Sequence, residues 1–282
     1  MKRILTLCIT LCVLTSGFAQ IDTTGKEQKA DTIKVGGMII IKRPGEKREI
    51  KREKDVSIPE RKSSKNSNVS TNWWIIDLGF NNVRDNTVYG SADANSYLVG
   101  IPPFTEDEMK LRAGKSVNVN VWVFMQKLNI IKHVVNLKYG LGVELFNFRY
   151  KKNNNISYKE ANPPYIFRDT VQFSKNKLAA DYVTIPLMLN FNTTPRSGNK
   201  GLSFSAGVSA GYLYSNRNKQ ESNERGKEKE KGDIGLNRFK LAYVGELGLG
   251  PIRLYGTYAI TNLYDRGLDQ QPYAVGIRFS NW

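Results

Sequence analysis

The chain has 282 residues and a formal net charge of +16, and its mean hydropathy is −0.43. Beyond residue 20 no apolar run approaches the roughly 18 residues of a spanning helix, which excludes a helical membrane protein but not a β-barrel. The two cysteines, Cys8 and Cys12, both precede residue 20, so disulfides, zinc thiolate sites and cysteine nucleophiles are excluded for the rest of the chain.

Residues 1–19 have the pattern of a secretory signal peptide. Lys2 and Arg3 precede an apolar core of about ten residues, and small residues lead to Ala19. An N-terminal membrane anchor is the weaker alternative, because the apolar core is shorter than the roughly 20 residues that a spanning helix needs. We therefore expect export, with cleavage near Ala19 or Gln20.

Residues 20–72 are rich in charges, Ser and Asn, and contain no aromatic residue. Such a composition buries too little apolar surface to offset chain entropy, so we expect a mostly flexible periplasmic extension. Within it, residues 33–44 read IKVGGMIIIKRP, two β-prone runs joined by Gly36-Gly37. This island is interpreted either as a small docking hairpin or as a transient strand in a linker, and the composition favours the linker.

Residues 73–282 contain eight segments in which apolar and polar residues alternate, as in β-strands with one apolar face. The segments are 73–80, 117–125, 135–145, 183–191, 202–212, 239–249, 252–260 and 273–279. Most are longer than the five or six residues common in soluble sandwiches, and they approach the roughly 9–11 residues that a tilted strand needs to cross a bilayer.

The connections between these segments alternate between long and short. Long polar links at 81–115, 151–177 and 215–237 and an intermediate link at 264–271 are separated by short ones near 129–132, 193–200 and 250–251. Membrane barrels have short periplasmic turns and long extracellular loops, and only a closed sheet leaves no unpaired edge in lipid. The sequence therefore predicts an all-β fold, an eight-stranded antiparallel transmembrane up-and-down β-barrel.

The alternation assigns one face of each strand to lipid and the other to the lumen. Lipid-facing residues are predicted to include Val117, Val119, Val121, Val123, Val183, Ile185, Leu187 and Leu189, and Met125 continues the same stripe. The lumen is predicted to hold a polar and charged network of Asp77, Lys138, Glu144, Lys240, Glu246, Arg253 and Arg278. Because eight strands leave a lumen that side chains can fill, we interpret this network as a salt-bridged plug, with an ionic pathway as the alternative.

Aromatic residues near strand ends are expected to form the girdles at the two membrane interfaces. They are Trp73, Trp74, Tyr150, Tyr182, Tyr212, Tyr214, Tyr255, Tyr258, Tyr264, Tyr273 and Phe279. Trp122 points inward in this register, which indicates either that it fills the lumen or that the register shifts nearby.

Two segments, DYVTIPLMLNF (Asp181 to Phe191) and YAVGIRF (Tyr273 to Phe279), together with the export signal ending in FAQ, resemble the outer-membrane β-barrel proteins of Bacteroidetes in the PorT-like or "porin family" group. The resemblance covers about residues 73–282. It implies a place in the outer membrane and insertion by an assembly machinery that reads the last strand, here through Tyr273, Val275, Ile277 and Phe279. Trp282 lies beyond this stripe and out of its parity.

No catalytic residue, cofactor or metal site is expected. The single histidine, His133, begins a strand beside a short turn, and no acidic pair stands out. The acidic run TEDEM (Thr105 to Met109) lacks the Gly and the spaced oxygen ligands of a calcium loop and is interpreted as a solvated turn.

The expected partners are outer-membrane lipid and lipopolysaccharide, the assembly machinery, and an envelope protein that contacts residues 20–72; export argues against nucleic acid. The loop RNKQESNERGKEKEKGD (Arg217 to Asp233) interleaves basic and acidic residues, so it either bridges lipopolysaccharide phosphates or solvates itself. The predicted role is a non-enzymatic structural or interaction protein of the envelope, accessory to secretion. A small-solute channel and a lipid-modifying enzyme are the alternatives.

Overall fold

The computed structural model describes residues 31–35, 38–42, 67–194, 201–249 and 252–280. The predicted signal peptide, the predicted turns at Gly36-Gly37 and Gly250-Pro251, and Trp282 lie outside these residues. The chain divides into two units, residues 1–64 and 65–282. In the first unit β1 (Asp31–Val35) pairs antiparallel with β2 (Met38–Lys42), so the two β-prone runs of the island form the strands of a hairpin. No helix among the described residues is long and apolar enough to cross a membrane.

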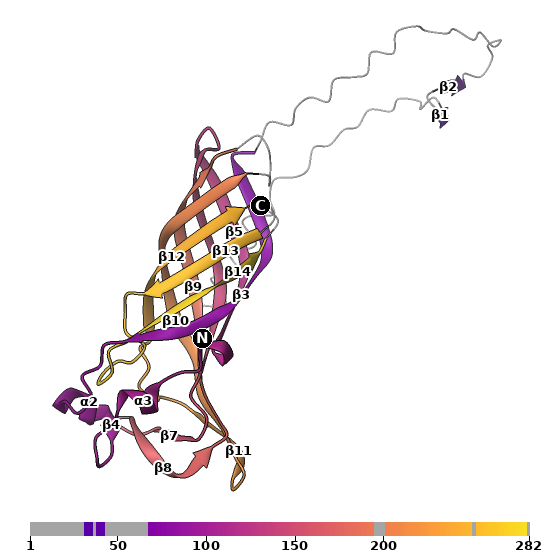
Figure 1. The fold of residues 1–282 in the computed structure, drawn as a ribbon. Helices are drawn as coiled ribbons and strands as arrows, with labels where there is room; N and C mark the ends of the chain where they lie inside the picture. Colours follow the sequence, from indigo (N-terminus) through magenta and orange to yellow (C-terminus); the bar gives the residue numbers. More distant parts are fainter. Residues whose placement is uncertain (1–30, 36–37, 43–66, 195–200, 250–251, 281–282) are drawn as a thin grey trace. The chain divides into compact units, whose positions relative to one another are not determined.

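The second unit is built on eight antiparallel strands that close into a ring (Figure 1). Around the ring they are β3 (Val69–Asp85), β5 (Val117–Ile131), β6 (Val135–Arg149), β9 (Lys175–Asn192), β10 (Leu202–Ser222), β12 (Phe239–Leu249), β13 (Ile252–Ala259) and β14 (Gln270–Phe279). The ring closes where β14 pairs with β3, with Arg278 opposite Asp77. Each predicted segment coincides with one of these strands, so the eight-stranded barrel is confirmed.

The period of two determines which side chains enter the barrel. Along β6 every second side chain is buried from Asn136 to Phe148, and the intervening ones remain partly exposed. The outward positions of the ring are mostly apolar and exposed, whereas many of the inward ones are polar. The barrel thus has an apolar exterior and a polar interior, the reverse of a protein folded in water.

A bulge in β5 changes this alternation near Trp122. The pairing of β5 with β6 shifts by one residue between Trp122 and Phe124, so Trp122 and Met125 both point inward. The prediction that Met125 faces lipid is therefore wrong, because an extra residue in one strand reverses the faces of all residues beyond it. Both interpretations of Trp122 hold, since it fills the lumen and the register shifts just after it.

The long connections fold into a cap at one end of the barrel (Figure 1). They contain α2 (Ala92–Tyr97), β4 (Leu98–Val99), α3 (Glu106–Met109), the 3-10 helix η1 (Ala113–Lys115), β7 (Asn154–Lys159) and β8 (Tyr165–Phe173). Strand β8 pairs in parallel with β4 and antiparallel with β7. We define the cap as residues 86–116, 150–174, 232–238 and 260–269. A further strand, β11 (Gly226–Lys231), pairs with the end of β10 beside it.

Local capping signals explain the two short helices of the cap. The hydroxyl of Ser91 accepts a hydrogen bond from the Ala94 amide at the start of α2. Thr105 and Glu108 form a capping box around α3. The TEDEM run, predicted to be a solvated turn, is therefore a helical turn in which Glu106 and Asp107 are exposed and Glu108 is partly buried against Arg168.

Candidate functional site

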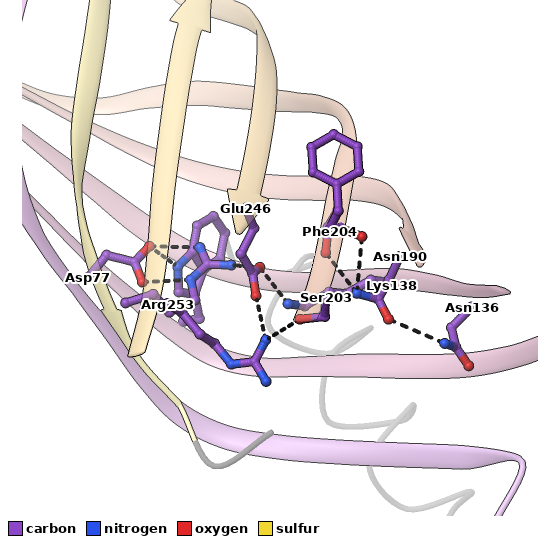
Figure 2. Close-up of polar contacts among 11 residues, drawn as sticks. Asp77, Asn136, Lys138, Asn190, Ser203, Phe204, Glu246 and Arg253 are labelled. Atoms are coloured by element: carbon purple, nitrogen blue, oxygen red, sulfur yellow. Dashed lines mark hydrogen bonds and ion pairs between the residues drawn. The ribbon is translucent and has the colours of Figure 1, made fainter. Parts of the chain in front are cut away.

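Glu246 on β12 is the centre of an ion-pair cluster across the barrel interior (Figure 2). Its Oε2 accepts hydrogen bonds from Lys138 Nζ at 2.5 Å and from Arg278 Nη1 at 2.7 Å. Its Oε1 accepts one from Arg253 Nη1 at 3.2 Å. These side chains come from four strands, β6, β12, β13 and β14, and all are buried. The cluster therefore bridges the lumen rather than lining one wall of it.

Arg278 links this cluster to the first strand of the ring. Its Nε and Nη2 atoms donate to the two carboxylate oxygens of Asp77, each at 2.7 Å. Asp77 Oδ2 also accepts from Trp122 Nε1 at 2.8 Å and from Asn120 Nδ2 at 3.1 Å. Buried charges are tolerated only when their partners and hydrogen bonds are complete, and Asp77 meets this condition with four donors.

A second charged pair lies on β6 and β12. Glu144 Oε2 accepts hydrogen bonds from Thr184 Oγ1 at 2.9 Å and from Lys240 Nζ. Lys240 Nζ also lies 4.5 Å from the ring centre of Phe146 and 5.1 Å from that of Tyr182. A desolvated ammonium over aromatic faces gains a cation–π attraction, so this pair joins the polar interior to aromatic packing.

Aromatic residues fill the barrel mouth and continue into the cap. They belong to a core cluster that contains Phe146 and Phe148 from β6, Tyr182 from β9 and Tyr158 from β7. Within it the rings of Phe146 and Phe148 stack at 5.8 Å. The barrel end under the cap is thus closed by a hydrophobic core of its own.

Three tyrosine hydroxyls meet inside this core. Tyr158 and Tyr264 are hydrogen-bonded at 2.7 Å, Tyr150 and Tyr264 at 3.3 Å, and Tyr150 also bonds directly to Tyr158. Burial raises the pKa of Tyr158 and Tyr264 well above the usual range, so both stay neutral. The triad joins the end of β6, strand β7 and the connection between β13 and β14.

Arg168 on β8 holds the first long connection in place. It donates to the Glu108 carboxylate at 2.7 and 3.2 Å and to the carbonyl oxygens of Pro102 and Pro103 at 2.7 and 3.1 Å. Its guanidinium also lies 4.1 Å from the centre of the Phe104 ring. The planar fork of arginine suits this set of acceptors, and the tip at Pro102 is consequently fixed.

Asp169 of β8 forms a bidentate ion pair with Arg225, which lies in the turn between β10 and β11. Arg225 donates to both of its carboxylate oxygens, at 2.8 and 2.9 Å, and the Val171 amide donates to Oδ1 at 3.1 Å. Burial disfavours the charged carboxylate, but the hydrogen bonds from Arg225 and the Val171 amide outweigh it and lower the pKa of Asp169.

The structure brings the seven expected interior charges into the barrel, where each is at most 6% exposed. The expected lipid-facing side chains lie on the outside of the barrel, exposed or partly exposed, as do the four residues of the closing strand. The seven charges fall into two groups, one around Glu246 and the other at Glu144, which the alternation alone did not distinguish.

The prediction of aromatic girdles is wrong for four tyrosines. Tyr150, Tyr182, Tyr255 and Tyr264 are buried, each at most 3% exposed. Tyr255 donates to Asn118 Oδ1 at 2.7 Å. Its hydroxyl occupies the space where a side chain at Gly79 would lie, since a Cβ there would approach it to 2.5 Å.

Sequence reasoning missed the aromatic residues of the cap, of which Tyr97, Phe104 and Tyr158 are fully or almost fully buried. They lie in polar loops without a regular period, so no hydrophobic repeat marks them. Their one signal is that large aromatic residues occur in otherwise polar loops, where a fully solvated loop would not need them.

The residues that the structure describes offer few side-chain groups suited to metal binding or catalysis. Among the described residues no group of three or more His, Cys, Asp or Glu side chains is arranged to hold a metal ion. His133 lies in the turn between β5 and β6, where its amide donates to Asn129 Oδ1 at 2.6 Å.

A closed ring of eight strands with an apolar exterior and a salt-bridged interior has the form of an outer-membrane barrel, and comparison with known families agrees. Residues 67–265 match the family model described as "Outer membrane protein beta-barrel domain". The chain belongs to this family. As an outer-membrane β-barrel, it has the cap on the extracellular side, because the long loops of such barrels are extracellular and their short turns periplasmic.

No curated protein matches the chain significantly. Among solved structures, similarity is found to Ail, the attachment invasion locus protein of Yersinia pestis, in complex with the heparin analogue sucrose octasulfate. The identity is 12%, the match covers 74% of this chain and 98% of that chain, and the TM-score is 0.27. A similarity of this extent carries no conclusion about function.

Proposed function

We propose that this outer-membrane barrel is closed to solutes and acts as a non-enzymatic interaction protein, with its folded cap as the contact surface. The filled interior carries this proposal. The ion pairs around Glu246 bridge the lumen, and the aromatic core under the cap fills the mouth of the barrel. An eight-stranded barrel is just wide enough for side chains to fill, so these two levels leave no continuous path for water or ions.

The cap supports the interaction role. Ile101 is fully exposed and Val99 is half exposed, and both belong to the connection that Arg168 fixes through Pro102 and Pro103. Apolar side chains that are held rigidly in water suit a partner surface, because binding then orders little new chain. The partner is an envelope or surface protein, in keeping with a structural or accessory role in the envelope.

The remaining expectations belong to the same proposal. The outward stripe that includes Val183, Ile185 and Leu187 contacts lipid, and the stripe from Tyr273 to Phe279 is what the assembly machinery reads. The N-terminal residues 20–72 act in the periplasm on a second envelope partner. These assignments, like membership of the PorT-like group of Bacteroidetes, rest on the residue pattern.

Conductance in planar bilayers tests whether the barrel is closed. The full chain, refolded and verified by heat-modifiable migration on a cold denaturing gel, is expected to produce no steady single-channel current. A reproducible unitary current that persists across preparations would contradict the closed barrel and favour the small-solute channel.

Site-specific photocrosslinking in living cells tests the interaction role. A photoreactive residue at Ile101 is expected to give one discrete crosslinked protein, whereas one at the exposed outward position Phe239 in the barrel wall is expected to give none. The absence of any protein crosslink from Ile101 would contradict a partner at this surface.

A further inference from the structure

The run GKEKEK of β11 separates its charges onto two faces. Lys229 lies opposite Lys219 of β10, and Glu228 lies opposite Gln220. Gln220 is buried on the inner side, so Glu228 also faces inward, while Lys219 and Lys229 face outward. The lysines and glutamates alternate along the sequence and seem to neutralise one another there. The strand nevertheless places the lysines on one face and the glutamates on the other.

Lys219 and Lys229 continue a row of basic residues across four neighbouring strands. Arg149 on β6 is opposite Lys177 on β9, Lys177 is opposite Lys219 on β10, and Lys219 is opposite Lys229 on β11. Three strand spacings of about 4.8 Å give the row a length of about 14 Å. We call Arg149, Lys177, Lys219 and Lys229 the basic row.

No member of the basic row forms an ion pair within the part of the chain that the structure describes, although Glu221 lies near Arg149. Nearby basic residues do have one, since Arg217 pairs with Asp181 and Lys175 with Glu221, but no carboxylate lies within ion-pair distance of the four members. Like charges directly opposite each other on a sheet are destabilising. A row of four is an electrostatic cost that an anionic ligand would relieve.

The height of the basic row on the barrel indicates where that anion lies. On β9 the outward residues on the periplasmic side of the row are apolar from Val183 to Phe191. On β10 the exposed Tyr212 and Tyr214 also lie on the periplasmic side of Lys219. With a rise of about 3.3 Å per residue and a tilt near 45°, Lys219 lies roughly 12 Å beyond Tyr214. The row thus stands just outside the hydrocarbon, at the level of the lipid headgroups.

We propose that the basic row binds the phosphate groups of a phosphorylated glycolipid in the outer leaflet, the lipid A part of lipopolysaccharide. Ammonium and guanidinium groups donate charge-assisted hydrogen bonds to phosphate oxygens, and a row along the wall meets headgroups that lie side by side in the leaflet. The apolar stripe that begins at Val183, on the periplasmic side of the Asp181–Arg217 ion pair, contacts the acyl chains of the same lipid. This site is independent of the closed lumen and of the cap surface.

The test compares two variants with equal loss of charge. The first, Lys177→Gln/Lys219→Gln/Lys229→Gln, removes three members of the basic row. The control, Lys151→Gln/Lys152→Gln/Lys159→Gln, removes three exposed lysines of the cap. The full chain and both variants are refolded into phosphatidylcholine nanodiscs that contain bisphosphorylated lipid A, dephosphorylated lipid A or neither, and heat-modifiable migration verifies each fold.

Retention of lipid A by the protein through exchange with phosphatidylcholine discs is the measured quantity. Because each basic side chain at an anionic surface contributes about fivefold, the first variant is expected to lose roughly 100-fold in affinity for bisphosphorylated lipid A, and the control less than about threefold. The difference is expected to shrink at high salt.

Three results would overturn the proposal. Equal losses in both variants would show an effect of net charge alone, and equal retention of dephosphorylated lipid A would exclude phosphate as the ligand. If soluble inorganic phosphate competed as strongly as lipid A vesicles, the ligand of the basic row would be a free anion and not the glycolipid.

Discussion

Arg278 on the last strand and Asp77 on the first lie directly opposite each other across the closing seam of the barrel, joined by two parallel hydrogen bonds of 2.7 Å. This seam joins the last strand of the chain, β14, to the first strand of the ring, β3, so its backbone hydrogen bonds are the last to form in chain order. The ion pair lies between these two strands. Because both groups are buried and hydrogen-bonded in a bidentate geometry, they specify which register of the two strands completes the ring.

Replacing Arg278 with Met should weaken the closed barrel by about 3–5 kcal/mol, since it leaves Asp77 as a buried charge without its main partner. The measurement is the urea midpoint of unfolding in detergent, followed by tryptophan fluorescence and by loss of heat-modifiable migration. Arg84→Met is the matched control, because Arg84 lies on the same seam but is exposed and should cost less than about 1 kcal/mol. Equal costs for the two substitutions would contradict a special role of the buried pair.

Single substitutions in the lumen should not open a conducting path. A lumen sealed by its ion pairs alone would conduct after Glu144→Ala or Arg253→Ala, but the aromatic core at the capped end of the barrel stays in place in either variant. Current in planar bilayers is expected only when a lumen change such as Lys138→Ala is combined with Tyr158→Ala/Tyr264→Ala. A steady current through the Glu144→Ala barrel would show that the core under the cap does not seal it.

Tyr97→Ala should loosen the cap and leave the barrel intact. The Tyr97 ring lies against Gly235 and Gly267, packs 5.5 Å from the Tyr264 ring, and its hydroxyl donates to the Ile234 carbonyl oxygen. Loss of a buried aromatic ring costs about 3–5 kcal/mol, here in the cap. Limited proteolysis should therefore cut residues 86–116 much faster, with unchanged heat-modifiable migration, whereas Val88→Ala at an exposed position should behave like the unmodified chain.

The cap should also loosen in acid. The pKa of Asp169 is lower in the folded protein than in the unfolded chain, where it is near 3.9, so its pairing with Arg225 stabilises the cap above that value. This stabilisation is lost as the pH falls through the lowered pKa. Pepsin digestion between pH 5 and pH 2 should show faster cleavage of the cap at the acid end.

Asp169→Asn separates this effect from general acid unfolding. The variant should be cut faster than the unmodified chain at pH 5 and should show a smaller further increase toward pH 2. Glu224→Gln, at an exposed position of the neighbouring turn, should retain the pH profile of the unmodified chain. An unchanged profile in Asp169→Asn would assign the acid effect to other groups.

The strands and the inward charges of the barrel could be predicted from the sequence because a period of two is a local property. Lys138 and Glu144 alternate with apolar neighbours on a single strand, and nothing distant is needed to place them. Their partners could not be predicted in this way, since the contact of Lys138 with Glu246 crosses the lumen between strands far apart in the chain.

Bulges and loops mark the limits of such reasoning. Met125 turns inward because β5 contains one extra residue opposite β6. The sequence around Met125 gives no sign of this bulge. Tyr150 and Tyr264 looked like girdle residues because both lie near strand ends, yet loops that fold back over the mouth bury them. The predicted loop between β10 and β12 likewise looked neutral in sequence. In the structure part of it pairs as β10 and β11, in a register that places its lysines on one basic face.

The tyrosine triad has a consequence for the order of assembly. Tyr264 lies between β13 and β14, whereas Tyr150 and Tyr158 come more than a hundred residues earlier. The three hydroxyls can therefore meet only after the end of the chain has been delivered to the barrel mouth. Resistance of the early loops to protease thus reports, from outside the cell, that the far end of the same polypeptide has finished its insertion.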